Sequence, residues 1–352
     1  MVPEPEQRFI RLNLVTVIVT IVLILAGGVV RSTGSGMGCP DWPKCFDQYV
    51  PPTSVDQLPR DYKEKYVAGR VKKNERFARL LERMGKKDVA DSIRHDQSIT
   101  VPETFNVAKT WTEYINRLTG AVTGFLLVAL AVMSLTYKKK AKRIIFLSIL
   151  NLVVVVFQAW LGSIVVSTNL LAWVVTVHML LALVILAILV YTYYYARSRY
   201  QQQTVIIATV FWLKVLLLAA IVFSIIQITL GTEVREAIDA VAKNMFYQGR
   251  GSWVSRAGEV FSYHRDLAVV VGILNVFVYQ VVMNKFGGRA TELRLGNAIL
   301  LVLLIQIASG LLLSNFALPP LAQVVHLVCS TVLFTLQFYL YLLVYRTNTY
   351  NQ

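Results

Sequence analysis

Three of the four histidines lie in long apolar segments, where an ionisable side chain usually has a functional reason to be present. His178, His264 and His326 lie at equivalent depths near one end of these segments, the end that we expect to face outside. Imidazole is the most common metal ligand in proteins. Three imidazoles at matched positions favour ligation of a metal or of heme over the packing of a lone histidine. His95 lies in a charged loop, and we assign it no role.

The second half of the chain carries two of these histidines, and the first half carries one. Helical membrane proteins hold heme between facing helices through axial imidazoles. His264 and His326, on alternate helices, are suited to a six-coordinate heme, whose usual role is electron transfer. The partner expected for His178 is Asn116, which matches His264 by position, and an amide is a poor iron ligand. The first half therefore either leaves an iron position open or lets another group occupy it, and an open position favours chemistry or ligand exchange over plain electron transfer.

Glu113 adds a carboxylate that the second half lacks. It lies three residues before Asn116, so the two side chains share a helical face. Its counterpart in the second half is Phe261. Near the edge of a heme, this carboxylate could accept protons or stabilise a cation. The alternative is a structural role, either as a helix cap or as the partner of Arg117.

Four arginines recur at the expected outer boundary of the membrane: Arg31, Arg117, Arg235 and Arg265. A guanidinium group binds carboxylates in a bidentate manner, and heme carries two propionates. Simple anchoring at the interface is an equally good interpretation of these positions.

An internal repeat relates the two halves. The segment "QAWLGSIVVSTNLLAWVVTVHM" (158–179) matches "QIASGLLLSNFALPPLAQVVHL" (306–327), and the same offset aligns "YINR" with "SYHR". Near the first apolar segment, "GGVVR" (27–31) matches "GTEVR" (231–235) at a larger offset, because the first half contains a longer loop. The repeat predicts two equivalent units, at 1–200 and 201–352.

Hydropathy predicts the elements that position these residues. The chain has 352 residues, of which 56% are hydrophobic, and its mean hydropathy is +0.56. Helices and closed barrels are the structures that satisfy the backbone in lipid, and the runs do not alternate as barrel strands do. We predict an all-α integral membrane protein, with two four-helix bundles related by a pseudo-two-fold axis along the membrane normal. Its eight transmembrane helices are expected near 10–30, 114–136, 143–166, 172–195, 208–230, 262–283, 295–314 and 321–345.

The net charge is +15, from 35 basic and 20 acidic residues. In a soluble protein this excess would suggest nucleic acid, but here the basic residues cluster in alternate connections, such as "KKKAKR" at 138–143. The positive-inside rule then places both termini in the cytoplasm and the long loop at 32–112 outside. No cleavable signal is evident. We expect a bacterial inner membrane protein, no nucleic-acid partner, and amphipathic helical structure within the loop.

Two of the three cysteines, Cys39 and Cys45, lie in this loop within "CPDWPKC". An oxidising compartment permits a disulfide there, and the alternative is a pair of free thiols. The third, Cys329, is one turn beyond His326 and is interpreted as a packing residue.

The chain resembles the heme A synthase family. The resemblance is carried by "GGVVRSTGSGMGCPDWPKC", "EYINRLTG", "TVHM", "YHRD" and "VVHL", which together cover both halves outside the long loop. It implies an eight-helix oxidoreductase that oxidises the C8 methyl group of heme O to a formyl group, making heme A for terminal cytochrome oxidases. Heme O synthase and oxidase assembly factors are the partners that it suggests.

The resemblance also implies roles for individual residues. In the C-terminal half His264 and His326 would ligate a heme b cofactor, with Arg265 and Arg235 nearby. In the N-terminal half the substrate heme would lie among His178, Asn116, Arg117 and Arg31, with Glu113 as the catalytic carboxylate. Cys39 and Cys45 match the family's cysteine pair. The family's usual motif is Glu-x-x-His-Arg, and this chain departs from it with Asn116.

A second class of function explains part of the pattern. A membrane cytochrome b that passes electrons between a quinone and an outer acceptor would also need His264 and His326, and it would tolerate Asn116 in a non-catalytic first half. An electron conduit needs neither Glu113 nor the "CPDWPKC" loop, which favours the enzyme. A transporter with repeated halves would explain the repeat but not the histidines.

Overall fold

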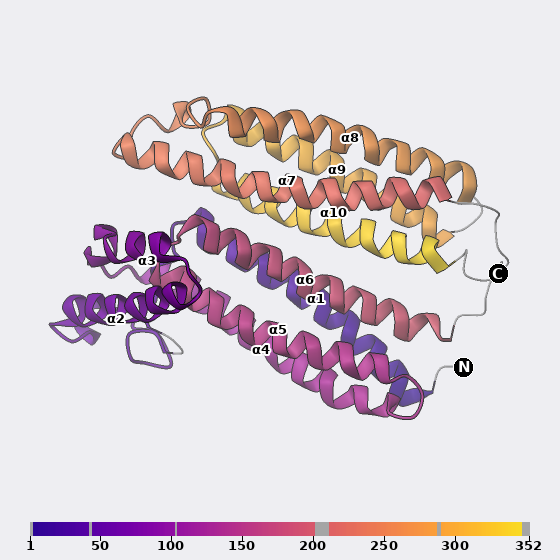
Figure 1. The fold of residues 1–352 in the computed structure, drawn as a ribbon, viewed down its shortest axis with the longest axis horizontal. Helices are drawn as coiled ribbons and strands as arrows, with labels where there is room; N and C mark the ends of the chain where they lie inside the picture. Colours follow the sequence, from indigo (N-terminus) through magenta and orange to yellow (C-terminus); the bar gives the residue numbers. More distant parts are fainter. Residues whose placement is uncertain (1–2, 42–43, 103, 201–210, 287–289, 347–352) are drawn as a thin grey trace.

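The computed structural model describes residues 3–41, 44–102, 104–200, 211–286 and 290–346, and in these ranges the protein is helical. Apart from an isolated bridge between Cys45 and Gln48, they contain no β-structure. Eight helices are long and apolar enough to cross a membrane. They are α1 (Glu4–Ser32), α4 (Val107–Ser134), α5 (Lys142–Ser167), α6 (Ala172–Ser198), α7 (Phe211–Asn244), α8 (Glu259–Phe286), α9 (Ala290–Asn315) and α10 (Pro320–Arg346) (Figure 1). The eight predicted spans are confirmed, and the boundary predicted at residue 200 adjoins residues outside the described ranges.

Local sequence explains where several helices begin. Asn106 caps α4, because its side-chain oxygen accepts a hydrogen bond of 3.0 Å from the Lys109 amide. Prolines stand at the start of α1 and of α10, where the missing amide proton costs nothing.

Helix α7 continues beyond the end of its predicted apolar span at 208–230, of which residues 208–210 lie outside the described ranges. The sequence becomes charged at Glu233, but the helix continues to Asn244. On this extension Val234, Ile238 and Ala242 recur at helical spacing and are buried. Val234 and Ile238 pack in one cluster with other buried apolar residues, among them Val254 and Leu318. An amphipathic extension therefore follows the membrane span.

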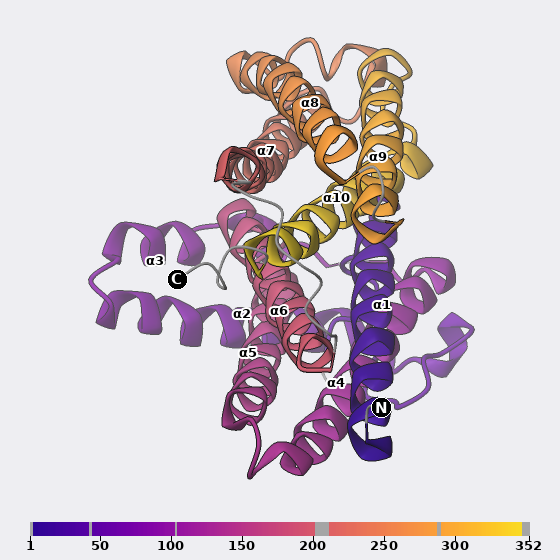
Figure 2. The same ribbon diagram turned by 90° about the vertical axis from the view of Figure 1, so that its right-hand side faces the viewer.

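The long helices pack in two groups. In the first group α1 and α5 each contact α4 and α6. In the second group α7 and α9 each contact α8 and α10. Helix α10 joins the groups, since it also packs against α1 and α6, and α6 contacts α7. In Figure 2 the helices are seen nearly end-on, with α10 lying between the two groups.

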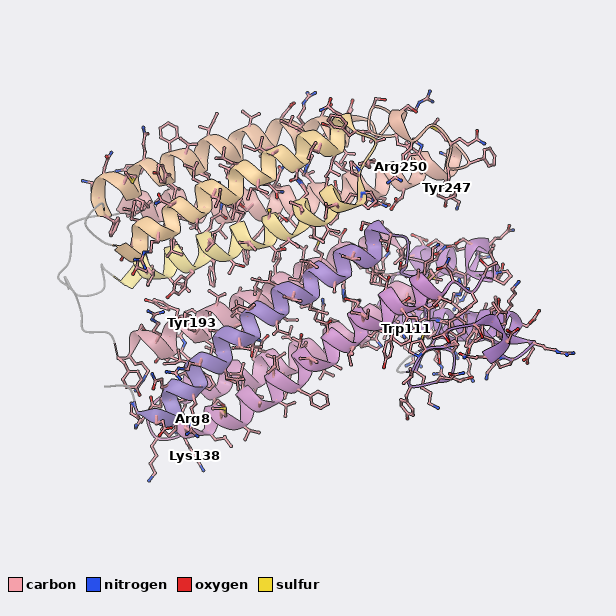
Figure 3. The ribbon with its side chains drawn as sticks, turned by 180° about the vertical axis from the view of Figure 1, so that it is seen from behind. Arg8, Trp111, Lys138, Tyr193, Tyr247 and Arg250 are labelled. Atoms are coloured by element: carbon pink, nitrogen blue, oxygen red, sulfur yellow. A yellow bond between two sulfur atoms is a disulfide. The ribbon has the colours of Figure 1, made fainter. Side chains whose placement is uncertain are left out.

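Both terminal helices have their free ends on the same side of the molecule. The start of α1 and the end of α10 lie at the same end of the molecule, on the right in Figure 1. Arg8 and Lys138 lie at this end in Figure 3, whereas Trp111, Tyr247 and Arg250 lie at the opposite end. The buried carboxylate of Glu6 is paired here with Lys140 at 2.8 Å.

The long loop folds into two further helices beyond the opposite end, α2 (Tyr62–Arg83) and α3 (Lys87–Arg94). One face of this pair is apolar and packs against α5 and α6, with Phe77 stacked on Trp173 at a centroid distance of 6.2 Å. The Asn74 amide donates a hydrogen bond of 2.7 Å to the Ser167 carbonyl at the end of α5. The expected amphipathic helices are present, and they are fixed to the membrane helices.

Candidate functional site

His264 on α8 and His326 on α10 are brought together across the second group of helices. Their ring centroids are 6.3 Å apart. Two imidazoles that bind one metal ion from opposite sides, through bonds of about 2 Å, have centroids roughly 6 Å apart. The distance between the rings therefore matches the space that one metal ion needs. Both histidines are half-buried.

The contacts of His326 indicate which ring nitrogen carries the proton. Its Nδ1 lies 3.2 Å from the carbonyl oxygen of Gln306 and 3.0 Å from the Ser309 hydroxyl. A carbonyl only accepts, so Nδ1 is the protonated nitrogen and Nε2 keeps its lone pair. The Gln306 amide nitrogen lies 3.1 Å from that Nε2. This tautomer is the one that binds a metal through Nε2.

Each membrane histidine lies against a glycine of a neighbouring helix. A Cβ added to Gly162, Gly231 or Gly310 would lie 3.2 Å from the Cε1 atom of His178, His264 or His326, respectively. That distance is tighter than ordinary van der Waals contact, so a side chain there would push the ring away. The glycines therefore allow the rings to pack directly on helix backbone.

In the first group of helices, His178 on α6 faces α5, and Asn116 on α4 faces α1. The side-chain oxygen of Asn116 is 3.9 Å from the Cβ position of Gly27. This oxygen is buried and has no hydrogen-bond partner among the described residues, and the same is true of His178 Nδ1. A ligand that offers hydrogen-bond donors or a metal could satisfy these atoms.

Glu113 is buried beside the disulfide loop. Its carboxylate accepts a hydrogen bond of 2.8 Å from the Cys39 amide and is paired with Arg117. Arg117 also donates to the carbonyls of Cys39, at 2.7 Å, and Lys44, at 3.2 Å. The structural alternative for Glu113 is therefore observed: the carboxylate and Arg117 fasten this loop to α4.

Gly38 shows how closely the loop approaches α4. A Cβ at Gly38 would lie 2.5 Å from the Lys109 carbonyl oxygen, a distance that real atoms do not adopt. The Thr110 hydroxyl donates a hydrogen bond of 2.9 Å to the Gly38 carbonyl. The glycine thus permits the backbone contact that brings the Cys39 amide to Glu113.

A disulfide joins Cys39 and Cys45, which decides between the two alternatives left by the sequence. Both cysteines are buried, and Trp42 and Pro43 between them lie outside the described residues. Cys329 is a free thiol.

This bridge leads to a labelling prediction. In unfolded, non-reduced protein, a thiol reagent is expected to label Cys329 alone, and reduction before labelling is expected to add two labels, at Cys39 and Cys45. Mass spectrometry of the labelled peptides measures both states, with Cys329 as the internal control. Three labels without reductant would contradict the bridge.

The predicted propionate arginines have protein partners. Arg31 on α1 is paired with Asp239 on α7 at 2.8 Å, and Arg235 is paired with the same carboxylate at 3.0 Å. Arg235 also donates a hydrogen bond to Gln323. Asp239 thereby links the two groups of helices. Arg265 pairs with Asp266 at 3.0 Å on the surface, with 63% of its side chain exposed.

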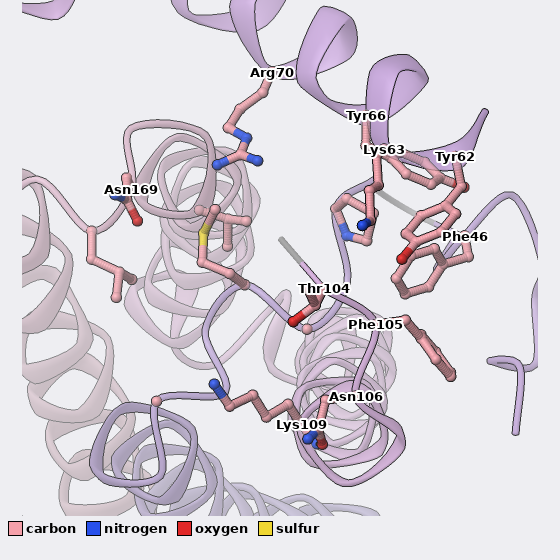
Figure 4. Close-up of a pocket in the computed structure, with 16 residues that line it drawn as sticks. Phe46, Tyr62, Lys63, Tyr66, Arg70, Thr104, Phe105, Asn106, Lys109 and Asn169 are labelled. Atoms are coloured by element: carbon pink, nitrogen blue, oxygen red, sulfur yellow. The ribbon is translucent and has the colours of Figure 1, made fainter. Parts of the chain in front are cut away.

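A cavity of about 210 Å³ lies beside the disulfide loop, between that loop, the start of α2 and the start of α4 (Figure 4). Lys63, Arg70 and Lys109 contribute basic groups to its wall, and Tyr62 and Phe46 contribute aromatic rings. None of the three membrane histidines lines it. The cavity is therefore separate from the imidazole sites.

Three features of the site were missed by the sequence interpretation: Gln227, Asp239 and Ser309. Gln227 had a detectable signal, because "QITLG" at 227–231 repeats the spacing of Gln158 and Gly162. Asp239 and Ser309 had none, since their importance depends on side-chain contacts between helices.

The fold is that of a polytopic α-helical membrane protein, and it brings two half-buried imidazoles together. The model of the family described as "Cytochrome oxidase assembly protein" matches residues 10–84 and 81–338. The chain belongs to this family, and the resemblance found in its motifs is confirmed.

Two curated relatives are named "Heme A synthase". The protein of Shouchella clausii is 23% identical over 346 residues, which cover 96% of this chain and 97% of that protein. The protein of Shewanella oneidensis is 24% identical over 185 residues, which cover 53% of this chain and 44% of that protein. The second match therefore spans less than half of the relative's length.

Proposed function

We propose that this protein is a heme A synthase, an oxidoreductase that converts the methyl group of heme O to a formyl group. Family membership supports the reaction. The single structural observation that carries the proposal is the His264–His326 pair, whose 6.3 Å separation suits one iron. We infer that the enzyme has an electron-transfer cofactor of its own in addition to the substrate heme.

We assign the cofactor, heme b, to the C-terminal half. His264 and His326 would hold it, since Nδ1 of His326 carries the proton, which leaves Nε2 unprotonated, and both rings pack on glycine backbone. Bound there, heme b would supply one-electron chemistry. Arg235, in the C-terminal half of α7, would lie close to the heme propionates. Arg265, which follows His264 on α8 and is exposed, would contribute to binding the propionates from the surface.

The substrate heme O is assigned to the N-terminal half. His178 would hold its iron from one side, and the unpaired oxygen of Asn116 would offer a hydrogen-bond acceptor instead of a second imidazole. Arg31 lies at the C-terminal end of α1, and Arg117 lies in the N-terminal part of α4. Glu113 would accept protons as the methyl group is oxidised. Its hydrogen bond from the Cys39 amide and its pairing with Arg117 would fix the direction of the carboxylate.

The recurrence of histidine facing glycine supports the repeat as the organising principle of the fold. We infer two four-helix bundles, 1–200 and 201–352, related by a pseudo-two-fold axis along the membrane normal. The positive-inside rule places both termini in the cytoplasm and the disulfide loop outside, in a bacterial inner membrane. A disulfide is suited to that outer compartment. Heme O synthase and oxidase assembly factors are the expected partners.

Asn116 leads to a second prediction. In the Asn116→His variant, an imidazole replaces the amide beside Gly27, and we expect the bound substrate heme to become bis-imidazole and six-coordinate. Absorption and electron paramagnetic resonance (EPR) spectra of protein loaded with heme O measure this change. The matched control is Asn116→Ala, which removes the amide without adding a ligand. An identical substrate-heme spectrum in Asn116→His and wild type would contradict the assigned pocket.

The heme content of purified protein tests the function against the alternative, an electron-transfer cytochrome b. Protein from cells that lack heme O is expected to contain one heme b per chain, and added heme O is expected to bind at a second, exchangeable site. A cytochrome b would instead hold heme b in all of its sites and would have no affinity for heme O. Two tightly bound heme b groups per chain would therefore favour the alternative.

A further inference from the structure

Every imidazole in the membrane helices faces a Gln-x-x-x-Gly pair on the helix that precedes it in the chain. Residues four apart lie on one helical face, so each glutamine and glycine approach the same histidine. The pairs are Gln158 and Gly162 facing His178, Gln227 and Gly231 facing His264, and Gln306 and Gly310 facing His326.

In two pairs the glutamine amide holds the histidine residue directly. Gln158 Nε2 donates a hydrogen bond of 2.9 Å to the carbonyl of His178, and Gln227 Nε2 donates one of 2.8 Å to the carbonyl of His264. Gln227 Nε2 also lies 3.5 Å from His264 Nε2, so the amide is next to the ring. In the third pair the backbone carbonyl of Gln306 and the Ser309 hydroxyl contact His326 Nδ1.

The fourth unit of the repeat lacks both the histidine and the glutamine. Gly27 occupies the glycine position and faces Asn116, but Leu23 stands where the other units have glutamine. Leu23 packs near Gly120, so α1 and α4 associate without an amide. Helix packing alone therefore does not require the glutamine. The amide is present where an imidazole is present.

The unpaired atoms indicate what the amide does for the ring. The Oε1 atoms of Gln158 and Gln227 are buried without a hydrogen-bond partner, and so are the Nδ1 atoms of His178 and His264. Each of these sites thus holds one free acceptor and one free ring nitrogen. When one ring nitrogen of a histidine binds a metal, the other carries a proton and usually donates it to a nearby acceptor.

We infer that Gln158 and Gln227 are positioning residues for the heme-binding imidazoles. When iron binds Nε2 of His264, it displaces the Gln227 amide nitrogen that lies beside this ring nitrogen, and the amide oxygen then accepts the Nδ1–H hydrogen bond. Gln158 serves His178 in the same way. Ser309 and the Gln306 carbonyl serve His326 in the same way. Such a hydrogen bond makes the imidazole a stronger donor to iron and favours the ferric state. The inference rests on the proposed assignment of heme b to His264 and His326.

The midpoint potential of heme b tests this inference. The variant is Gln227→Leu. It places leucine at the position where the unit without a histidine has Leu23. It is expected to bind heme b with a higher midpoint potential than wild type and with shifted EPR g values. Loss of the acceptor weakens the donation from His264 and frees the ring to rotate. Gln158→Leu is the matched control, because the same substitution beside His178 should leave the potential of heme b unchanged.

The two possible failures are distinguishable. Wild-type protein without a six-coordinate heme b would overturn the proposed cofactor site itself. A wild-type heme b whose potential and g values are unchanged in Gln227→Leu would overturn only the role of the glutamine. If Gln227→Leu does not fold, Gln227→Asn, which withdraws the amide by one methylene, is expected to shift the potential in the same direction. Failure of both variants to fold would overturn the inference in favour of a structural role.

Discussion

The Glu113→Gln variant is expected to keep heme b and to form heme A about 10²–10⁴-fold more slowly than wild type, the usual cost of losing one general base. Glutamine preserves the shape of the side chain and can still accept the hydrogen bond from the Cys39 amide. It cannot accept a proton from the substrate. Heme A formation by purified protein, measured per heme b, gives the rate.

The control for this variant separates chemistry from anchoring. Glu113 also pairs with Arg117, so its replacement could release the disulfide loop. The rate of disulfide reduction by a mild reductant reports on that release, and we expect a change far smaller than the loss of turnover. Glu259→Gln, at an exposed carboxylate in the first turn of α8, should leave heme A formation unchanged. Heme A formation at the wild-type rate in Glu113→Gln would show that the carboxylate is not catalytic.

Replacing His264 or His326, the proposed ligands, is expected to abolish the low-spin spectrum of heme b. The 6.3 Å separation of the rings suits one iron bound by two imidazoles. Each of the variants His264→Ala and His326→Ala leaves only one of these two imidazoles. The absorption and EPR spectra of protein prepared without heme O measure the loss.

Two further histidines serve as controls for these variants. His178→Ala should keep the low-spin heme b and lose the coordination of added heme O, because His178 packs against α5 in the other group of helices. His95→Ala should change neither spectrum, since His95 is an exposed residue at the end of α3. An unchanged six-coordinate heme b in both His264→Ala and His326→Ala would refute the ligand assignment.

Most of the fold was predictable from the sequence, because hydropathy over about 20 residues reports directly on membrane spans. The extension of α7 was not predictable in this way. The charges at Glu233 and Arg235 end the apolar run, although Val234 and Ile238 continue one buried face of the helix. Hydropathy measures the mean of a window, whereas packing depends on one face.

The site was predictable where the repeat determines it. The repeat placed His264 and His326 at one depth on alternate helices, and the structure brings their rings together. The pairing of Glu113 with Arg117, four residues along the same helix, was foreseen as the structural alternative. The hydrogen bond from the Cys39 amide to Glu113 depends on how the disulfide loop lies against α4 at Gly38. It joins residues far apart in the sequence, so no local pattern predicts it.

The most direct test of the proposed reaction is the mass of the heme extracted from cells that express this chain together with a source of heme O. If the protein is a heme A synthase, the extract contains heme A, in which a formyl group replaces the methyl group of heme O, and cells without the chain contain heme O alone. An extract that contains heme O and no heme A, from cells whose protein carries its six-coordinate heme b, would contradict the proposed function.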